Sequence, residues 1–330
     1  MDSAGAQIAV DNVAFVINPR SGGGGGDRVY LWVAERLRQH EIPIAAFETT
    51  REGGAAPAVE AALRAGFTEI WVIGGDGTIQ EALRPIIEAG AVLGSLPGGT
   101  GNRLVVELGR APNDPVAQAV WMMRQPVWRI DVGEAEGHLF TGRLGIGFEA
   151  EAAEEVVKDK SGLGNLAYVV AGLRAARDIE PKHLRLTSDR EIIYDGPMLA
   201  AMITNLPMRL PLKVPGLASS GPFDGLLHAI VLREKPGLDA LWRWLLGSDE
   251  CEPDDAVFEH CGPAYRVEVP NGAPMHLDGE VIGTLERFDA RCHPRALRLR
   301  GLYLRPGAPA DGIDVAGLSD ATDEDSTQHE

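Results

Sequence analysis

A loop of glycines, one aspartate and one threonine follows four large apolar residues at 70–73. It reads Gly-Gly-Asp-Gly-Thr at 74–78. Glycines let a backbone approach a phosphate closely, and a helix that follows such a loop points its free N–H groups at the phosphate. Asp76 would repel a bare phosphate, so its carboxylate would act through Mg²⁺, a water, a ribose or a second substrate. The alternative is a simple Asp-Gly turn.

Two further loops of similar composition follow apolar runs, Asn-Pro-Arg-Ser-Gly at 18–22 and Leu-Pro-Gly-Gly-Thr-Gly-Asn at 96–102. Either loop alone could be a flexible connection without a ligand. Three such loops at neighbouring strand ends indicate a site for nucleotide phosphates. The chain has no lysine before Lys158, which excludes a Walker A loop in this half. Backbone N–H groups, hydroxyls, arginine or a metal would therefore hold the phosphates.

The second half of the chain carries paired carboxylates, Asp278 and Glu280, on either side of a glycine. Phosphoryl transfer to an alcohol uses a base near the hydroxyl, and this pair could supply it. An Asp-Gly hairpin turn is the alternative. The proline-rich stretch 206–217 alternates apolar residues with Arg209 and Lys213. It is either a lipid-facing lip or a buried connection.

The elements that would position these loops alternate between strands and helices in the first 130 residues. The predicted strands cover 8–17, 42–47, 70–73 and 91–96, and the predicted helices cover 29–39, 55–65 and 79–88. This alternation favours a parallel sheet with helices on both faces. Ligands of such sheets bind at the carboxyl ends of the strands, where the three loops would converge. We expect Pro85 to kink or shorten the third helix.

Beyond residue 130, short strand-like runs with turn signals predict an antiparallel sandwich or barrel. Helical stretches at 165–178 and 238–246 interrupt these runs. The predicted organisation is an α/β domain at 8–130 and a β-rich domain at 131–305, with the option that the last strand returns to the first domain. The stretch 307–330 carries seven acids and no Lys or Arg, and it is expected to be disordered.

Composition narrows the class of protein. The net charge of −17 argues against nucleic acid as a partner. Three cysteines without CxxC spacing argue against a disulfide framework and a structural zinc site, which fits a reducing cytosol. No apolar run is long enough to span a membrane, and residues 1–7 lack the features of a secretory signal. Any membrane contact is therefore expected to be local.

The three glycine-rich loops, in this order and spacing, resemble the diacylglycerol kinase catalytic domain. More narrowly, the chain is similar to the bacterial soluble lipid kinases of that superfamily, which are relatives of sphingosine kinases. Pro-Phe-Asp-Gly-Leu at 222–226 and Leu-Asp-Gly-Glu at 277–280 extend the resemblance over about residues 8–305. It implies an NAD kinase/diacylglycerol kinase-like architecture with an α/β N-terminal domain and a β-rich, sandwich-like C-terminal domain.

The resemblance also implies ATP and Mg²⁺ as cofactors and assigns roles to residues. The nucleotide-binding set would be Asn18, Pro19, Arg20, Ser21, Gly22, Thr49, Gly74, Gly75, Asp76, Gly77, Thr78, Thr100 and Asn102. Asp224, with backbone carbonyls at Gly221 and Leu226, would hold a second, structural Mg²⁺. Glu280 and Asp278 would activate the acceptor hydroxyl, and Asp76 would organise metal and waters. Which of these three carboxylates is the base stays open.

Two positions depart from the pattern that the resemblance implies. Arg103 follows Asn102 where an acid is usual, and Gly54 stands where an aspartate is common. Either change could alter the nucleotide site or the choice of substrate. Neither removes the three glycine-rich loops that define the site.

The expected function is transfer of the γ-phosphoryl group of MgATP to a lipid hydroxyl, with diacylglycerol converted to phosphatidic acid. The alternatives are a sphingoid-base or other lipid-alcohol kinase, an NAD kinase-like enzyme, and a non-catalytic lipid- or nucleotide-binding protein. The expected partner is a lipid substrate at a membrane surface, which the protein would reach by peripheral contact only. Whether the protein forms a homodimer is left open. The expected location is the cytoplasm, with peripheral contact at the inner membrane face.

Overall fold

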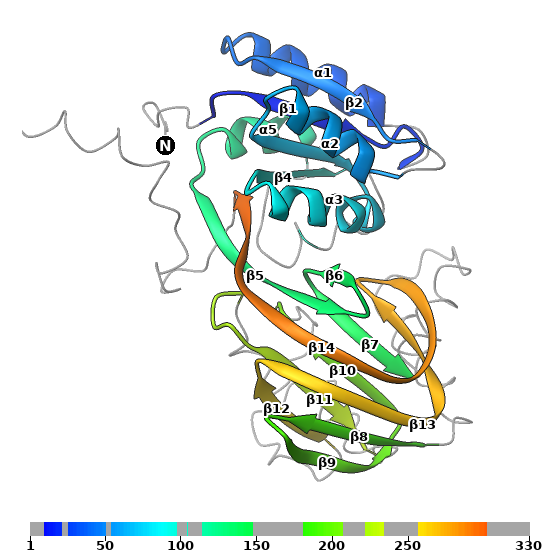
Figure 1. Ribbon diagram of the computed structural model, residues 1–330. Coiled ribbons are helices and arrows are strands. Elements are labelled where there is room, and N and C mark those ends of the chain that lie inside the picture. The colour runs from blue at the N-terminus through cyan, green and yellow to red at the C-terminus, as the bar shows by residue number, and fades with distance from the viewer. Residues whose placement is uncertain are drawn as a thin grey trace, which may run out of the picture. The chain divides into compact units, whose positions relative to one another are not determined.

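The computed structural model describes residues 10–21, 26–50, 54–97, 104, 114–147, 181–206, 222–233 and 257–301. The chain divides into two compact units (Figure 1). The first unit comprises Met1–Ile130 together with Arg295–Glu330, and the second comprises Asp131–Pro294. The first unit therefore contains two separate stretches of the chain.

A parallel sheet forms the centre of the first unit. Its four own strands are β1 (Val13–Ile17), β2 (Ile44–Glu48), β3 (Glu69–Gly74) and β4 (Val92–Pro97), in the order β2-β1-β3-β4. The end of β14 (Glu280–Arg300) adds a fifth parallel strand, because Arg298 and Leu299 pair with Val92 and Leu93 of β4. The sheet thus extends by a strand from far along the sequence.

Helices cover both faces of this sheet. They are α1 (Gly26–Arg38), α2 (Ala56–Arg64), α3 (Asp76–Glu88) and α5 (Pro115–Met122). Helix α1 packs against α5, and α2 packs against α3 (Figure 1). Strands β1 and β3 are fully buried because they lie in the middle of the sheet. Phe15 and Trp71 point to the face of α1 and α5 and meet edge to face.

Helix α3 is longer than the sequence pattern predicted. It begins at Asp76 and continues through Pro85 to Glu88, so Pro85 does not shorten it, and the alternative of a kink at Pro85 stays a prediction. Proline removes one helical hydrogen bond. Burial of Leu83 and Ile86 on the two sides of Pro85 offsets this loss.

A buried ion pair connects β3 to the returning end of β14. Arg300 donates from Nη2 to Oε2 of Glu69 at 2.8 Å and from Nε to Oε1, and both residues are about 95% buried. Trp71 also donates to Oε1 of Glu69 at 2.8 Å, and Arg300 donates to the carbonyl of Gln125 at 2.7 Å. These hydrogen bonds compensate the two buried charges, and the loss of either charged residue would leave the other unpaired, which would be strongly destabilising.

The second unit is built from antiparallel hairpins. Its strands are β5 (Val127–Ala135, which starts in the first unit), β6 (His138–Phe140), β7 (Arg143–Gly147), β8 (Lys182–Ser188), β9 (Glu191–Met198), β10 (Ala200–Thr204), β11 (Leu227–Leu232), β12 (Val257–Gly262), β13 (Ala264–Leu277) and most of β14. One path runs β12-β11-β10-β7-β13-β14. Strand β8 also pairs with β13, and β5 pairs with β14.

Strand β13 serves two sets of neighbours because it is interrupted in the middle. Its pairing with β14 shifts register between Glu268 and Ala273, and Asn271 and Gly272 there have φ of 69° and 71°. Residues 266–268 pair with β8, whereas residues 275–277 pair with β7. One apolar core, which includes Phe140, Tyr265 and Phe288, lies against both parts.

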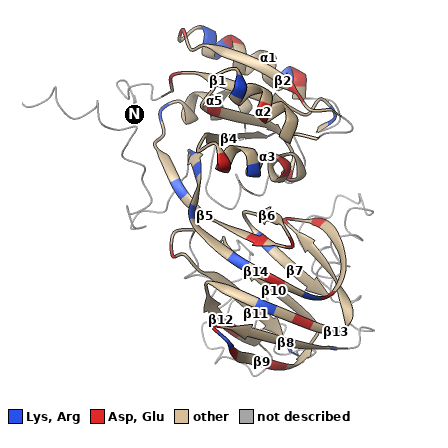
Figure 2. Ribbon diagram, viewed as in Figure 1, with Lys and Arg blue, Asp and Glu red and all other residues tan. Residues whose placement is uncertain are grey.

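These observations confirm the predicted fold class, an α/β N-terminal domain with a parallel sheet and a β-rich C-terminal region. The predicted helices at 165–178 and 238–246 and the stretch 307–330 lie outside the described residues. Within the described part of the chain, no helix is long and apolar enough to cross a membrane. Acidic and basic residues are interspersed along α1 and β14 (Figure 2).

Candidate active site

The loops that are predicted to bind the nucleotide lie in the first unit, where the strand order of the parallel sheet reverses. From β1 the chain moves outward to β2, and from β3 it moves outward to β4 on the other side. Open α/β sheets bind ligands at such a switch point, beyond the carboxyl ends of the strands. The predicted nucleotide loops begin at Asn18 and Gly74, directly at these two strand ends.

Three predicted residues meet at one edge because the strands are in register. Ile17 pairs with Glu48 of β2 and with Ile73 of β3. The chain positions that follow these residues, Thr49, Asn18 and Gly74, therefore lie side by side. Thr49 donates its N–H to the carbonyl of Ile17 at 2.9 Å, which continues the ladder by one residue.

Asn18 connects the two central loops. Its backbone N–H donates to Ile73 at 2.9 Å, and its side-chain Nδ2 donates to Oγ1 of Thr78 at 3.0 Å. Its Oδ1 accepts the N–H of Arg20 at 3.1 Å, and its carbonyl accepts the N–H of Ser21 at 3.1 Å. One amide thus fixes the turn after β1 and attaches it to the first turn of α3.

The sequence predicts a phosphate-binding cradle at the start of α3. Gly75 is the N-cap and has no side chain to cap the helix. The first helical hydrogen bond runs from Ile79 to Gly75 at 3.1 Å. The N–H groups of the first turn of a helix point out of its N-terminus. These groups and the positive end of the helix dipole favour phosphate.

Glycines are required around this cradle for steric reasons. A Cβ on Gly74 would lie 2.6 Å from Cβ of Thr78, and one on Gly26 would lie 2.7 Å from the carbonyl oxygen of Asn18. Thr78 itself is only 6% exposed, and its hydroxyl accepts the bond from Asn18. Thr78 therefore holds the loop, whereas half-buried Asp76 and exposed Arg20 are accessible to a ligand.

The structure gives a physical reason for glycine at position 54. Gly54 has φ of 63°, and a Cβ there would lie 2.3 Å from Oε2 of Glu81. The same Oε2 accepts the N–H of Ala55 at 2.7 Å, at the start of α2. An aspartate at position 54 would be strained at this φ, and it would push the Glu81 carboxylate away from Ala55 and repel it. Sequence reasoning did not find Glu81, whose partner lies 26 residues away.

The predicted carboxylate pair of the second unit lies in a tight hairpin. Asp278 and Gly279 have φ of 49° and 96° and form the two-residue loop between β13 and β14, closed by the pair Leu277 and Glu280. The Asp-Gly hairpin turn that stood as the alternative is therefore present, and a catalytic role of the two carboxylates stays a prediction. Glu280 is exposed at the start of β14.

The carboxylate of Asp278 is anchored by backbone groups. Its Oδ2 accepts the N–H of Thr141 at 2.8 Å, and its Oδ1 accepts those of Gly142 at 2.9 Å and Arg143 at 2.7 Å. The N–H of Asp278 donates to the carbonyl of Arg143 at 2.9 Å. Both oxygens are thus engaged, so Asp278 and Glu280 have different surroundings and can have different roles.

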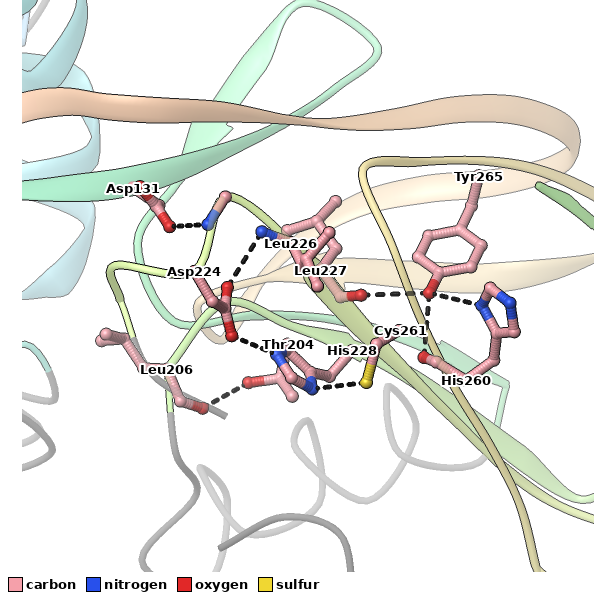
Figure 3. Close-up of polar contacts among 11 residues, drawn as sticks. Asp131, Thr204, Leu206, Asp224, Leu226, Leu227, His228, His260, Cys261 and Tyr265 are labelled. Atoms are coloured by element: carbon pink, nitrogen blue, oxygen red, sulfur yellow. Dashed lines mark hydrogen bonds and ion pairs between the residues drawn. The ribbon is translucent and has the colours of Figure 1, made fainter. Parts of the chain in front are cut away.

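Two fully buried residues, Asp131 and Asn205, join this hairpin to the Asp224 loop. Asp131 accepts the N–H of Gly225 at 2.7 Å through Oδ2 (Figure 3). Asn205 donates to the carbonyls of Asp131 at 2.8 Å and Thr141 at 3.0 Å. Sequence reasoning missed both residues. The available signal was the aspartate between the apolar residues Ile130 and Val132.

Asp224 is held at two points in its loop. Its Oδ1 accepts the N–H of Leu226 at 2.9 Å, and its Oδ2 lies 2.9 Å from Nε2 of His228 (Figure 3). Among the described residues, no three His, Cys, Asp or Glu side chains cluster to hold a metal. Mg²⁺ commonly takes one carboxylate with carbonyls and waters, and the Asp224 side chain, 31% exposed, fits that arrangement.

Several predicted positions fall outside the described residues. They are Gly22, Thr100, Asn102 and Gly221 of the predicted set, together with Arg103 and residues 207–217 of the proline-rich stretch.

Comparison with known proteins gives the family. The diacylglycerol kinase catalytic domain matches residues 12–135, which include the loops after β1 and β3. A protein of Pseudomonas syringae pv. syringae (strain B728a) named "Probable lipid kinase YegS-like" is 32% identical over 266 residues, 76% of this chain and 81% of that protein. The protein named "Diacylglycerol kinase" of Bacillus subtilis (strain 168) is 28% identical over 281 residues, 82% of this chain and 90% of that protein.

A crystal structure from Bacillus anthracis str. Sterne, described as a candidate diacylglycerol kinase, shares the fold. It has a TM-score of 0.71 and 21% sequence identity, and it covers 89% of this chain and 97% of its own. This chain therefore belongs to the diacylglycerol kinase catalytic-domain family and is a lipid kinase of that family. Kinases of this kind use ATP as the phosphoryl donor.

Proposed function

We propose that the protein transfers the γ-phosphoryl group of MgATP to the hydroxyl of diacylglycerol and so produces phosphatidic acid. The observation that carries the proposal is the hydrogen bond from Asn18 to Thr78, which holds two loops together at the switch point of the sheet. Family membership supports a lipid as acceptor. The name of the Bacillus subtilis relative favours diacylglycerol among lipids.

In this proposal the first unit binds the nucleotide. The N–H groups at the start of α3 receive phosphate oxygens, and exposed Arg20 supplies a positive charge near them. Asp76 would hold the Mg²⁺ that accompanies ATP, through its carboxylate or through a water. That Mg²⁺ would neutralise charge on the phosphates during transfer.

We assign the general base to Glu280 and a positioning role to Asp278. Glu280 is exposed, so its carboxylate can accept the proton of the acceptor hydroxyl as the oxygen attacks the γ-phosphorus and ADP departs. Asp278 already accepts three backbone N–H groups through its two oxygens. It keeps the hairpin that carries Glu280 in place.

The test is ATP turnover with a panel of acceptors in mixed micelles, with product identified by chromatography. The panel contains diacylglycerol, monoacylglycerol, a sphingoid base and, without lipid, NAD. We expect phosphatidic acid from diacylglycerol and a kcat about 10² to 10⁴-fold lower for Glu280→Gln. The matched control is Glu286→Gln, an exposed glutamate on the same strand, with parent-like turnover.

The other outcomes of this panel contradict the proposal in distinguishable ways. If only the sphingoid base gives product, the protein is a lipid kinase with an acceptor other than diacylglycerol. ADP release with NAD alone would give an NAD kinase-like enzyme. MgATP or lipid binding without turnover on any acceptor would leave a binding protein.

A further inference from the structure

Three polar side chains form a hydrogen-bonded row from the surface of β12 through β11 to the Asp224 loop (Figure 3). Cys261 Sγ lies 3.0 Å from Nδ1 of His228, and Nε2 of His228 lies 2.9 Å from Oδ2 of Asp224. His228 is only 7% exposed, whereas Cys261 is exposed. The two strands place these side chains together because His228 and Cys261 are directly opposite residues.

Chemistry fixes the direction of each hydrogen bond. The Asp224 carboxylate can only accept, so Nε2 of His228 carries the proton and donates. In the neutral imidazole Nδ1 is then an acceptor, and the Cys261 thiol is the group that can donate to it. The thiol thus selects the imidazole tautomer that binds Asp224.

The thiol remains protonated and can act as this donor. Partial burial of the sulfur, with the negative charges of Asp224 and Glu259, raises the pKa of the Cys261 thiol above its ordinary value. A thiol with a raised pKa is a poor nucleophile. The arrangement therefore resembles a catalytic Cys-His-Asp triad in connectivity but not in electrostatics.

The two oxygens of the Asp224 carboxylate have different partners. Leu226 donates to Oδ1, and His228 donates to Oδ2. Gly225 is in turn held by Asp131. His228 lies on β11, the strand that directly follows the loop, so its bond fixes the rotation of the carboxylate relative to the sheet.

We propose that His228 and Cys261 are positioning residues that orient the Asp224 carboxylate for Mg²⁺. This inference rests on the proposed function as a kinase of this family, whose resemblance implies that Asp224 holds a second, structural Mg²⁺. Partners of metal-binding carboxylates commonly change metal affinity by about 10 to 100-fold when they are removed. A thiol and an imidazole outside the ligand set would therefore tune the affinity without touching the ion.

The experiment is a Mg²⁺ titration of metal-stripped full-length protein without nucleotide or lipid, read as the rise in melting temperature. We expect His228→Leu to raise the Mg²⁺ midpoint about 10 to 100-fold and Cys261→Ala to raise it less. His228→Gln, which keeps a donor, and Cys261→Ser, which keeps a hydroxyl donor, should restore most of the affinity. A purely structural role would change the metal-free melting temperature but not the midpoint.

The matched control is His183→Leu, because His183 forms a similar pair with Asp195 at 2.6 Å on other strands. It should keep the parent midpoint. Asp224→Asn should abolish the saturable Mg²⁺ response. If His228→Leu and Cys261→Ala keep the parent midpoint while Asp224→Asn loses the response, the positioning role is wrong and the metal site stands. If Asp224→Asn also responds like the parent, the metal site itself is wrong.

Discussion

Replacing Asp278 by asparagine separates its positioning role from the proposed base role of Glu280. The Asp278 oxygens accept N–H groups at 2.7, 2.8 and 2.9 Å, and asparagine offers only one oxygen. If that oxygen keeps Gly142 and Arg143, the amide NH₂ faces the N–H of Thr141. One charge-assisted bond is lost, two are weakened and one donor is left unpaired.

The magnitude follows from these contacts. A hydrogen bond to a charged group contributes about 1.5–3 kcal/mol, and an unsatisfied donor costs about 1–3 kcal/mol. Because Asp278 is half-buried, we take the lower part of this range and expect about 3 kcal/mol less stability for the second unit. That loss corresponds to roughly 6–12 °C in melting temperature for a unit of 150–250 residues.

The assay compares Asp278→Asn with Glu280→Gln by thermal unfolding and by turnover at a temperature where both are folded. Glu280 is exposed, so Glu280→Gln should unfold within about 0.5 kcal/mol of the parent yet lose most of its kcat. Asp278→Asn should unfold at a clearly lower temperature than Glu280→Gln and keep more of its kcat, because it loosens the hairpin but leaves the Glu280 carboxylate. A stable Asp278→Asn variant with turnover as low as that of Glu280→Gln would refute the reasoning.

Three further predictions concern the first unit. Asn18→Ala should weaken MgATP binding about tenfold, measured by fluorescence titration, because it removes the bond that joins the two loops; unchanged affinity would contradict the site. Gly54→Asp should lower stability by about 2–3 kcal/mol in thermal unfolding, and adding Glu81→Ala should restore part of it, since the two carboxylates repel each other. Arg300→Met should cost about 3–5 kcal/mol in denaturant unfolding at neutral pH because it leaves the charge of Glu69 buried. Burial raises the pKa of Glu69 even with Arg300 present. Protonation of Glu69 therefore adds to the free energy of unfolding in full below the ordinary pKa of glutamate, and this addition is lost as pH rises through the raised pKa. Arg300→Met should accordingly recover stability as pH falls.

The parts of the fold that follow local patterns could be predicted from the sequence. Strands β1 and β3 are unbroken apolar runs, and both are fully buried. The glycines at 74 and 75 mark the end of β3 and the start of α3. These features depend on neighbours in sequence, so composition and periodicity report them.

The contacts that hold the site together could not be predicted in the same way. Asn205 meets Asp131 across 74 residues, and Asp278 meets Thr141 across 137 residues. A buried polar residue has many candidate partners in the sequence, and only the folded sheet selects one. The pairing of β13 with two different strands depends likewise on a register shift within it.

Transfer of labelled γ-phosphate from MgATP to diacylglycerol is the decisive measurement of the proposed activity. We expect label in phosphatidic acid with the parent protein and with Glu286→Gln. We expect almost none with Glu280→Gln, although that variant should bind MgATP as tightly as the parent. Full labelling of phosphatidic acid by Glu280→Gln would rule out Glu280 as the base. No labelled lipid from the folded, MgATP-bound parent would rule out the proposed activity.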